Sequence, residues 1–221
     1  IYEVPKGDYN LFAAKSWLAI IEWAISEGLI DKSRMLAACL AALDRTSNQT
    51  DRNGALILIK CIDADAEILA DHQANWLRLV ADDQPAVAGF AITQLQTLEK
   101  AKRIDAESAI AVLPHAFKHS TKSHALNAVK LLTRLAMQKS LRQKAIEAVA
   151  SGLMHPNKDV QAAAMETLHE HLQSTDEEAM RIIAGSVESV SQTLRKEVEA
   201  LTASSASSVP TTGGGNPQLD T

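Results

Sequence analysis

The fold is decided by the stretch His155-Pro-Asn-Lys-Asp-Val-Gln-Ala-Ala-Ala-Met-Glu-Thr-Leu168. Asn157 is of a type that caps the N-termini of helices. Val160, Ala164 and Leu168 follow at the four-residue spacing of one helix face. The stretch therefore predicts a helix that begins directly after Asn157.

Two earlier segments are similar to this one, and each opens a predicted helix. They are Pro85-Ala-Val-Ala-Gly-Phe-Ala-Ile-Thr-Gln-Leu95 and Ser123-His-Ala-Leu-Asn-Ala-Val-Lys-Leu-Leu132. When Val87, Ala125 and Val160 are aligned, the segments lie 38 and then 35 residues apart. Because a period of this size is typical of two-helix repeats, the sequence predicts a repeated helix pair.

The stretch at residues 155–168 closely resembles the turn and first helix of a HEAT repeat. There a Pro-Asn-type turn precedes an Asp-Val start, and alanines let neighbouring helices approach. The resemblance extends over residues 84–172, and the segment Trp17–Leu36 is similar to uncharacterised bacterial proteins with HEAT-like helices. It implies a bacterial α-solenoid of the HEAT/armadillo type, and no activity that could be carried over.

The composition agrees with a helical, globular chain. Of the 221 residues, 46% are hydrophobic and only 4% aromatic, and alanine and leucine dominate, which favours helices and nearly excludes an all-β fold. No apolar run approaches the length that crosses a bilayer, and no basic stretch leads into a secretion signal. We therefore expect a soluble, cytoplasmic protein in which Cys39 and Cys61 are buried, reduced thiols.

Cap residues and apolar periodicity predict an all-α fold of about five antiparallel helical hairpins over residues 1–202, with a flexible Ser/Gly/Pro/Thr-rich linker or tail at 203–221. The expected caps are Asp31, Asp51, Asp105, Thr121, Ser140, Asn157 and Thr175, with Pro85 at a first helical position and Gly28 as a left-handed stop. The expected helices are 9–27, 31–43, 52–62, 65–81, 85–100, 106–118, 122–138, 141–154, 158–172 and 176–202.

The first and the last expected helix each allow two interpretations of their apolar residues. Helix 9–27 is apolar nearly all round, so either the chain is a fragment of a longer protein whose neighbour covers this helix, or the helix is fully buried within a complete domain. In helix 176–202 the apolar residues follow coiled-coil spacing, which fits a long final helix along the preceding pair or self-association. These apolar residues are Met180, Ile183, Val187, Val190, Leu194 and Leu201.

Positive charge gathers in the middle of a chain whose net charge is −5. Residues 100–144 carry 10 basic and 2 acidic side chains. Two interpretations stay open: contact with phosphate, nucleic acid or an acidic protein face, or a solvated ridge compensated by acidic neighbouring repeats. Only Phe117 could stack on a base, which counts against nucleic acid. The candidate binding residues of this basic band are Lys118, Lys122, Lys130, Arg134, Lys139, Arg142 and Lys144.

The histidines do not form a convincing metal site. His115 and His119 are four residues apart with His124 nearby, but no Cys, Asp or Glu lies between residues 108 and 146 to complete a set. The His169-Glu170-His171 segment resembles one iron-binding pair of HEAT-repeat deoxyhypusine hydroxylases. Those enzymes need several such pairs, whereas the aligned positions here hold Gln96 and Thr133. We therefore expect no metal and no cofactor.

These observations predict a non-catalytic scaffold that binds another protein or another part of its own chain. No phosphate loop, nucleophile elbow or dinucleotide-binding fingerprint is present in the sequence. The alternative is anion or nucleic-acid binding through the basic band, and a metalloenzyme using His115, His119 or His169 ranks last.

Overall fold

The computed structural model describes the backbone of residues 9–206 and the side chains of residues 17–203. Every regular element in this part of the chain is a helix, so the expected all-α class is confirmed. None of the helices in the described range is both long and apolar enough to cross a membrane. The expected tail at 203–221 lies almost entirely outside the described residues, although the last helix continues to Ala206.

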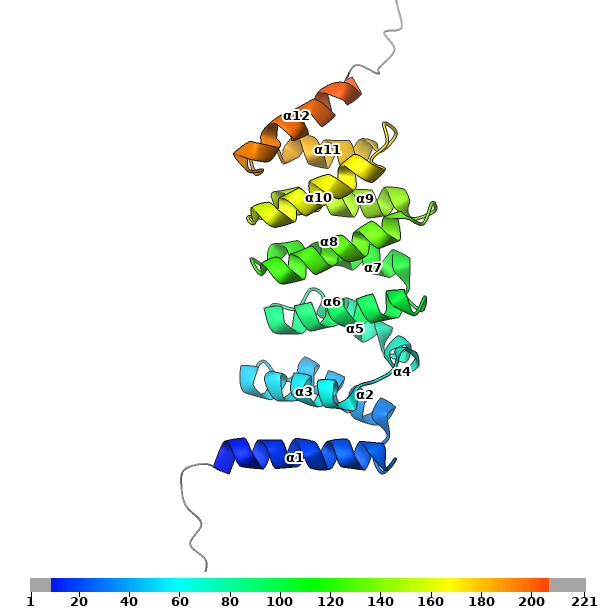
Figure 1. Cartoon of the computed structure of the whole chain (residues 1–221), viewed down its shortest axis with the longest axis vertical. Helices are drawn as coiled ribbons and strands as arrows, with labels where there is room; N and C mark the ends of the chain where they lie inside the picture. Colours follow the sequence, from blue (N-terminus) through cyan, green and yellow to red (C-terminus); the bar gives the residue numbers. More distant parts are fainter. Residues whose placement is uncertain (1–8, 207–221) are drawn as a thin grey trace, which may run out of the picture. The chain divides into compact units, whose positions relative to one another are not determined.

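The chain divides into two compact units, Ile1–Asp105 and Ala106–Thr221. In the first unit, α1 and α2 each pack against α3, and α4 and α5 pack against α6. Figure 1 shows these helices in blue to green. Their bounds are α1 Tyr9–Ser26, α2 Lys32–Arg45, α3 Gln49–Ile62, α4 Ala66–Asp71, α5 Gln73–Leu79 and α6 Pro85–Lys100.

The second unit has two layers of helices (Figure 1). α8 packs against α9 and α10, α9 also contacts α7 and α11, and α12 rests on α11. The core between the layers is made mainly of Leu, Val, Ile and Ala side chains. The elements are α7 Ala106–Val112, η1 Leu113–Lys118, α8 Lys122–Ala136, α9 Arg142–Ala150, η2 Ser151–Met154, α10 Lys158–His171, α11 Glu177–Gly185 and α12 Gln192–Ala206, where η marks a 3₁₀ helix.

Several predicted helix ends are confirmed. The Asn157 side chain accepts a hydrogen bond from the Asp159 amide at 3.0 Å, and Asp31 accepts one from the Arg34 amide at 2.8 Å. Pro85 lies in the first turn of α6, where the missing N–H of proline breaks no hydrogen bond of the helix. Gly28 has φ +69° and ends α1 as expected, because the Leu29 amide after it bonds back five residues to the Ala24 carbonyl.

Other predicted caps are wrong by one to three residues. The N-cap residues of α3, α9 and α11 are Asn48, Leu141 and Asp176, whereas the sequence predicts Asp51, Ser140 and Thr175. Asn48 accepts from the Thr50 amide at 2.9 Å, so α3 begins a turn earlier than expected. Thr121 does hold the cap position of α8, but its side chain makes no capping hydrogen bond.

The single helix expected over 65–81 is two helices that meet at His72. The buried indole of Trp76 donates to the Leu69 carbonyl at 3.1 Å, and the His72 amide bonds to the same carbonyl. Because Leu69 O already has these two donors, the chain turns there instead of continuing one regular helix.

The single helix expected over 176–202 is also wrong, because residues 186–191 separate α11 from α12. The buried Ser186 hydroxyl donates to the Ile183 carbonyl at 2.7 Å, and Gln161 of α10 bonds to the backbone of Ser189 and Ser191. Ile183, like Val190 in the connection, is buried. The heptad-like residues therefore include core residues of unit 2 and do not lie on one continuous coiled-coil helix.

The described side chains of α1 contradict the interpretation that this helix is fully buried. Trp17 and Trp23 of α1 are exposed, and Trp76 is the fully buried tryptophan of the described residues. Both cysteines are free, as expected, but only Cys39 is buried and Cys61 is half-buried. Burial is the main reason why the pKa of the Cys61 thiol is raised, and a hydrogen bond to Glu22 raises it further.

Candidate functional site

The seven basic-band residues lie on different parts of unit 2 instead of on one patch. Lys118 ends η1, Lys122 begins α8 and Lys130 and Arg134 follow along α8. Lys139 lies in the turn after α8, and the remaining two, Arg142 and Lys144, lie in the first turn of α9. Since a helix rises about 1.5 Å per residue, Lys122 and Arg134 are about 18 Å apart along α8. One small anion could not contact both.

Arg142 is an internal structural residue of unit 2. Its Nη1 and Nη2 atoms donate to both carboxylate oxygens of Asp176 at 2.6 and 2.8 Å, and Nη1 also donates to the His171 carbonyl at 2.9 Å. The side chains are 19% and 1% exposed. The Arg142 hydrogen bonds lower the pKa of the Asp176 carboxyl below its ordinary value. The Arg142 guanidinium is therefore already occupied by a carboxylate of the chain itself.

Two lysines of the band are paired on the surface. Lys122 bonds to Asp159 at the start of α10, and Lys144 Nζ lies 3.2 Å from Glu107 of α7. The hydrogen bond from Lys122 lowers the pKa of Asp159. All four side chains are about half exposed or more, so these pairs contribute little to stability. They do compensate charge between neighbouring helices, as one of the two interpretations of the band expected.

Three lysines of the basic band are exposed and make no ion pair or hydrogen bond with any described residue: Lys118, Lys130 and Lys139. We call them the unpaired lysines. Lys130 lies on the solvent side of α8, four residues after the half-buried Leu126. Lys139 lies two residues after Met137, which is 75% exposed. The outer surface of α8 thus combines unpaired positive charge with accessible apolar atoms.

Five of the polar side-chain contacts between segments of unit 2 join residues 34 to 37 apart along the chain, whereas Arg142–His171 and Gln161–Ser189 join residues 29 and 28 apart. Arg142–Asp176 and Thr133–Thr167 join residues 34 apart, and Lys122–Asp159 and Lys144–Glu107 join residues 37 apart. His155 Nε2 lies 3.0 Å from the His119 carbonyl, 36 residues back. These separations match the 35- and 38-residue offsets of the similar segments. These contacts therefore join segments that lie about one sequence offset apart along the chain.

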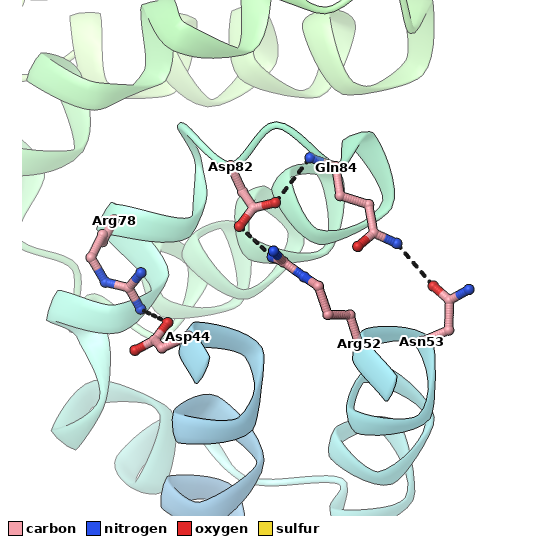
Figure 2. A network of polar contacts seen from close by, with 6 residues as sticks. All are labelled: Asp44, Arg52, Asn53, Arg78, Asp82 and Gln84. Carbon is pink, nitrogen blue, oxygen red and sulfur yellow. Dashed lines mark hydrogen bonds and ion pairs between the residues drawn. The ribbon is translucent and has the colours of Figure 1, made fainter. Parts of the chain in front are cut away.

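Unit 1 has polar contacts at somewhat shorter separations, 30 to 34 residues, in the network of Figure 2. Arg78 of α5 pairs with Asp44 of α2, 34 residues away, and Arg52 of α3 pairs with Asp82, 30 residues away. In the same network Gln84, next to α6, donates from Nε2 to Asn53 of α3 at 3.0 Å. Arg52 and Asp82 are both mostly buried, so this ion pair is better shielded from water than Arg78–Asp44. Polar contacts thus connect the α2–α3 pair to the α5–α6 pair.

The histidines do not converge on a metal site. Among the residues that the structure describes, no group of three or more His, Cys, Asp or Glu side chains could hold a metal ion. His115 Nδ1 lies 3.0 Å from the Val112 carbonyl of its own turn. Burial lowers the pKa of His124, and nearby His119 lowers it further, which favours the neutral imidazole. His169 is exposed at the end of α10.

Two clefts of unit 2 differ in the titratable groups that line them. One cleft brings α10 together with α11 and α12 around apolar side chains, with His169 as the single titratable group of its lining. Another lies between α7 and α9 and is lined by Glu107, Lys144 and Glu147, of which Lys144 pairs with Glu107. Acid–base chemistry needs two groups with complementary roles, which the first cleft does not offer. The lining of the first cleft is Leu168, His169, Leu172, Gln173, Ser174, Met180 and Leu201.

No known protein family, curated protein or solved structure matches this chain. The assignment of a function therefore rests on the residues and contacts of the chain itself. Sequence reasoning missed the partners of Arg142 and Lys122. The repeat offset was a usable signal for both, because Asp176 and Asp159 lie 34 and 37 residues further on.

Proposed function

We propose that the chain is a non-catalytic scaffold of the HEAT/armadillo type, an α-solenoid whose repeated helix pairs present a surface to another protein. The observation that supports this best is the spacing of contacts: polar side-chain contacts between helices join residues 28 to 39 apart along the chain. Contacts limited to neighbouring repeats are the property that defines solenoid proteins. Such folds offer extended surfaces more often than enclosed pockets.

The binding surface we propose is the outer side of α8 with its two flanking turns, carrying the unpaired lysines. An exposed lysine that has no partner among the described residues keeps its charge available to another molecule. Lys118 and Lys139 stand beyond opposite ends of α8, about 22 Å long. A partner that uses all three must contact the whole length of the helix, which fits an acidic protein surface better than a small anion.

Nucleic-acid binding is the weaker alternative. Arg142, Lys122 and Lys144 already pair with carboxylates of the chain, so less positive charge is available than the sequence indicated. Phe117, the aromatic residue of the band, is buried and offers no face on which a base could stack. We also propose a cytoplasmic location, which the two free cysteines support.

The test is affinity capture from the native source with three versions of the full chain. The first is the wild type, the second reverses the unpaired lysines (Lys118→Glu, Lys130→Glu, Lys139→Glu), and the third reverses two exposed charges outside the band (Arg195→Glu, Lys196→Glu). Arg142 is left unchanged because its reversal would place a carboxylate against the buried Asp176 and disturb folding. A protein captured by the first and third versions but not by the second supports the proposal.

Two other outcomes of the capture experiment would count against the proposal. Equal capture of one partner by all three versions would remove the α8 surface from the interface. Recovery of nucleic acid alone, with binding that falls steeply as salt rises in a titration, would favour the nucleic-acid alternative instead.

A further inference from the structure

One buried imidazole connects the starts of two neighbouring helices of unit 2. His155, which is 1% exposed, lies in the turn between η2 and α10. Its Nδ1 atom accepts a hydrogen bond from the Asn157 amide at 3.0 Å, and its Nε2 atom lies 3.0 Å from the carbonyl oxygen of His119, in the turn before α8. Because α8 and α10 pack against each other (Figure 1), the ring joins the N-terminal ends of both helices.

The two partners of the ring fix its protonation state. A backbone N–H can only donate a hydrogen bond, and a carbonyl oxygen can only accept one. The Nδ1 atom that faces the Asn157 amide must therefore be unprotonated, and Nε2 must carry the hydrogen that is donated to the His119 carbonyl. A proton added at Nδ1 would point at the Asn157 N–H. This arrangement therefore requires a neutral imidazole.

The contacts of His155 position the start of α10. Asn157 is the N-cap residue of α10, and its side chain accepts a hydrogen bond from the Asp159 amide at 3.0 Å. Asp159 also pairs with Lys122 at the start of α8. The His155 carbonyl accepts from the buried side chain of Gln161 at 2.8 Å. Movement of residues 155–157 would therefore disturb both the cap of α10 and the ion pair that joins α10 to α8.

A protonated His155 ring would lack a counter-charge, because none of the described carboxylates bonds to it. On α10, Asp159 is paired with α8 and the glutamates are exposed. Glu147 of α9 bonds to a glutamine of its own helix, and the acidic residues between 176 and 188 pair with arginines or are exposed. Burial lowers the pKa of His124 in the first turn of α8, and His119 lowers it further, so this region disfavours added positive charge. The other titratable groups on η1 and at the starts of α8 and α10 are basic: His115, Lys118, His119, Lys122 and Lys158.

We propose that His155 is an acid-sensitive latch between the start of α10 and the turn before α8, closed while the imidazole is neutral and opened when it takes up a proton. A histidine free of such contacts titrates near pH 6.5, so the latch is closed above about this pH and loosens below it. Because only the open form binds the proton, its population relative to the closed form should rise about thirtyfold between pH 7.5 and pH 5.0. This conformational change goes beyond the scaffold proposal and does not depend on it.

The protonation state can be measured directly in the full chain. Long-range ¹H–¹⁵N NMR correlations of the histidine rings, assigned to His155 through its backbone resonances, distinguish the two tautomers and the imidazolium. At pH 7.5 they should show His155 with the hydrogen on Nε2 and with Nδ1 unprotonated. A ring that carries its hydrogen on Nδ1, or that is charged at this pH, would overturn the proposal.

Hydrogen exchange followed by mass spectrometry measures the opening. After correction for the intrinsic effect of pH on exchange, the protection factors of residues 156–161 in the wild type should fall between about tenfold and thirtyfold from pH 7.5 to pH 5.0. Those of α6 in unit 1 should not follow this fall. His155→Asn keeps an oxygen that can accept from the Asn157 amide but does not titrate, so its protection at residues 156–161 should not fall in this way.

His169→Asn is the matched control, because it removes an exposed histidine of the same helix by the same substitution. It should lose protection at low pH as the wild type does. Protection at residues 156–161 that is independent of pH in the wild type would overturn the proposal. An equal fall in His155→Asn would also overturn it, since another group would then control the opening. The two wild-type measurements decide the question even if His155→Asn does not fold.

Discussion

The guanidinium of Arg142 at the start of α9 holds the carboxylate of Asp176 at the start of α11 through two parallel hydrogen bonds of 2.6 and 2.8 Å. The same guanidinium bonds to the carbonyl of His171, the last residue of α10. Asp176 in turn accepts from the Gln173 amide at 2.8 Å, which fixes the connection between α10 and α11. One ion pair thus joins three consecutive helices of unit 2.

Removing one partner of this pair should destabilise the fold. Asp176→Ala leaves the Arg142 guanidinium mostly buried without its counter-charge, and we expect a loss of about 3 kcal/mol in the free energy of unfolding. Urea titration followed by circular dichroism measures it. The control is Glu178→Gln, which breaks the exposed pair with Arg181 and should cause no measurable change. A loss for Asp176→Ala no larger than that of the control would show that the pair contributes nothing.

The same pair should make stability depend on pH below the neutral range. Because the folded state lowers the pKa of Asp176 relative to its unfolded value near 3.9, the pair contributes fully above about pH 4. Its contribution is lost as the pH falls through the lower pKa of the folded state. The difference in unfolding free energy between wild type and Asp176→Asn should therefore shrink between pH 6 and pH 3. A difference that stays constant over this range would contradict the assignment.

Close packing at Gly152 gives a third prediction. A β-carbon added at this buried glycine would lie 3.2 Å from Ala164 Cβ and 3.5 Å from the Phe117 ring. Gly152→Ala should therefore cost about 1–2 kcal/mol by overpacking. Ala164→Gly removes the closest contact, so a double-mutant cycle should show that the two changes together cost less than their sum. If the two changes in unfolding free energy were strictly additive, the segments that carry Gly152 and Ala164 would instead have moved apart.

A fourth prediction concerns the end of α6. Lys102 has φ +57°, and the following amide bonds to the Leu98 carbonyl at 2.9 Å, the arrangement that usually employs glycine. Lys102→Gly should raise the free energy of unfolding by about 0.5–1 kcal/mol. Lys100→Gly, two residues earlier within the helix, should instead lower it by about 1 kcal/mol. A thermal unfolding series that shows both variants destabilised would contradict the left-handed assignment.

Local signals predicted much of the fold. The starts of α2, α6 and α10 follow from Asp31, Pro85 and Asn157, whose effects act within one helical turn. The break between α11 and α12 could not be predicted in the same way, because it depends on Gln161, which bonds to the backbone of Ser189 and Ser191 about 30 residues away. The apolar spacing continues across that break and gives no sign of it.

The candidate site could be predicted only in part. The sequence located the positive charge of residues 100–144, but it could not separate Lys130, which has no partner among the described residues, from Arg142, which is committed to Asp176. Charge counts along the chain ignore contacts between repeats, and those contacts decide which cations are available. The 34-residue separation of Arg142 and Asp176 falls close to the repeat offset, so pairing opposite charges at this offset would have identified the partner.

The most direct test of the scaffold proposal is the affinity of the captured partner for the purified full chain. Isothermal titration calorimetry should give a dissociation constant at least tenfold higher for the triple reversal of Lys118, Lys130 and Lys139, which is a loss of about 1.4 kcal/mol or more. The Arg195→Glu, Lys196→Glu control should bind like the wild type. Equal affinities for the wild type and the triple reversal would contradict the account.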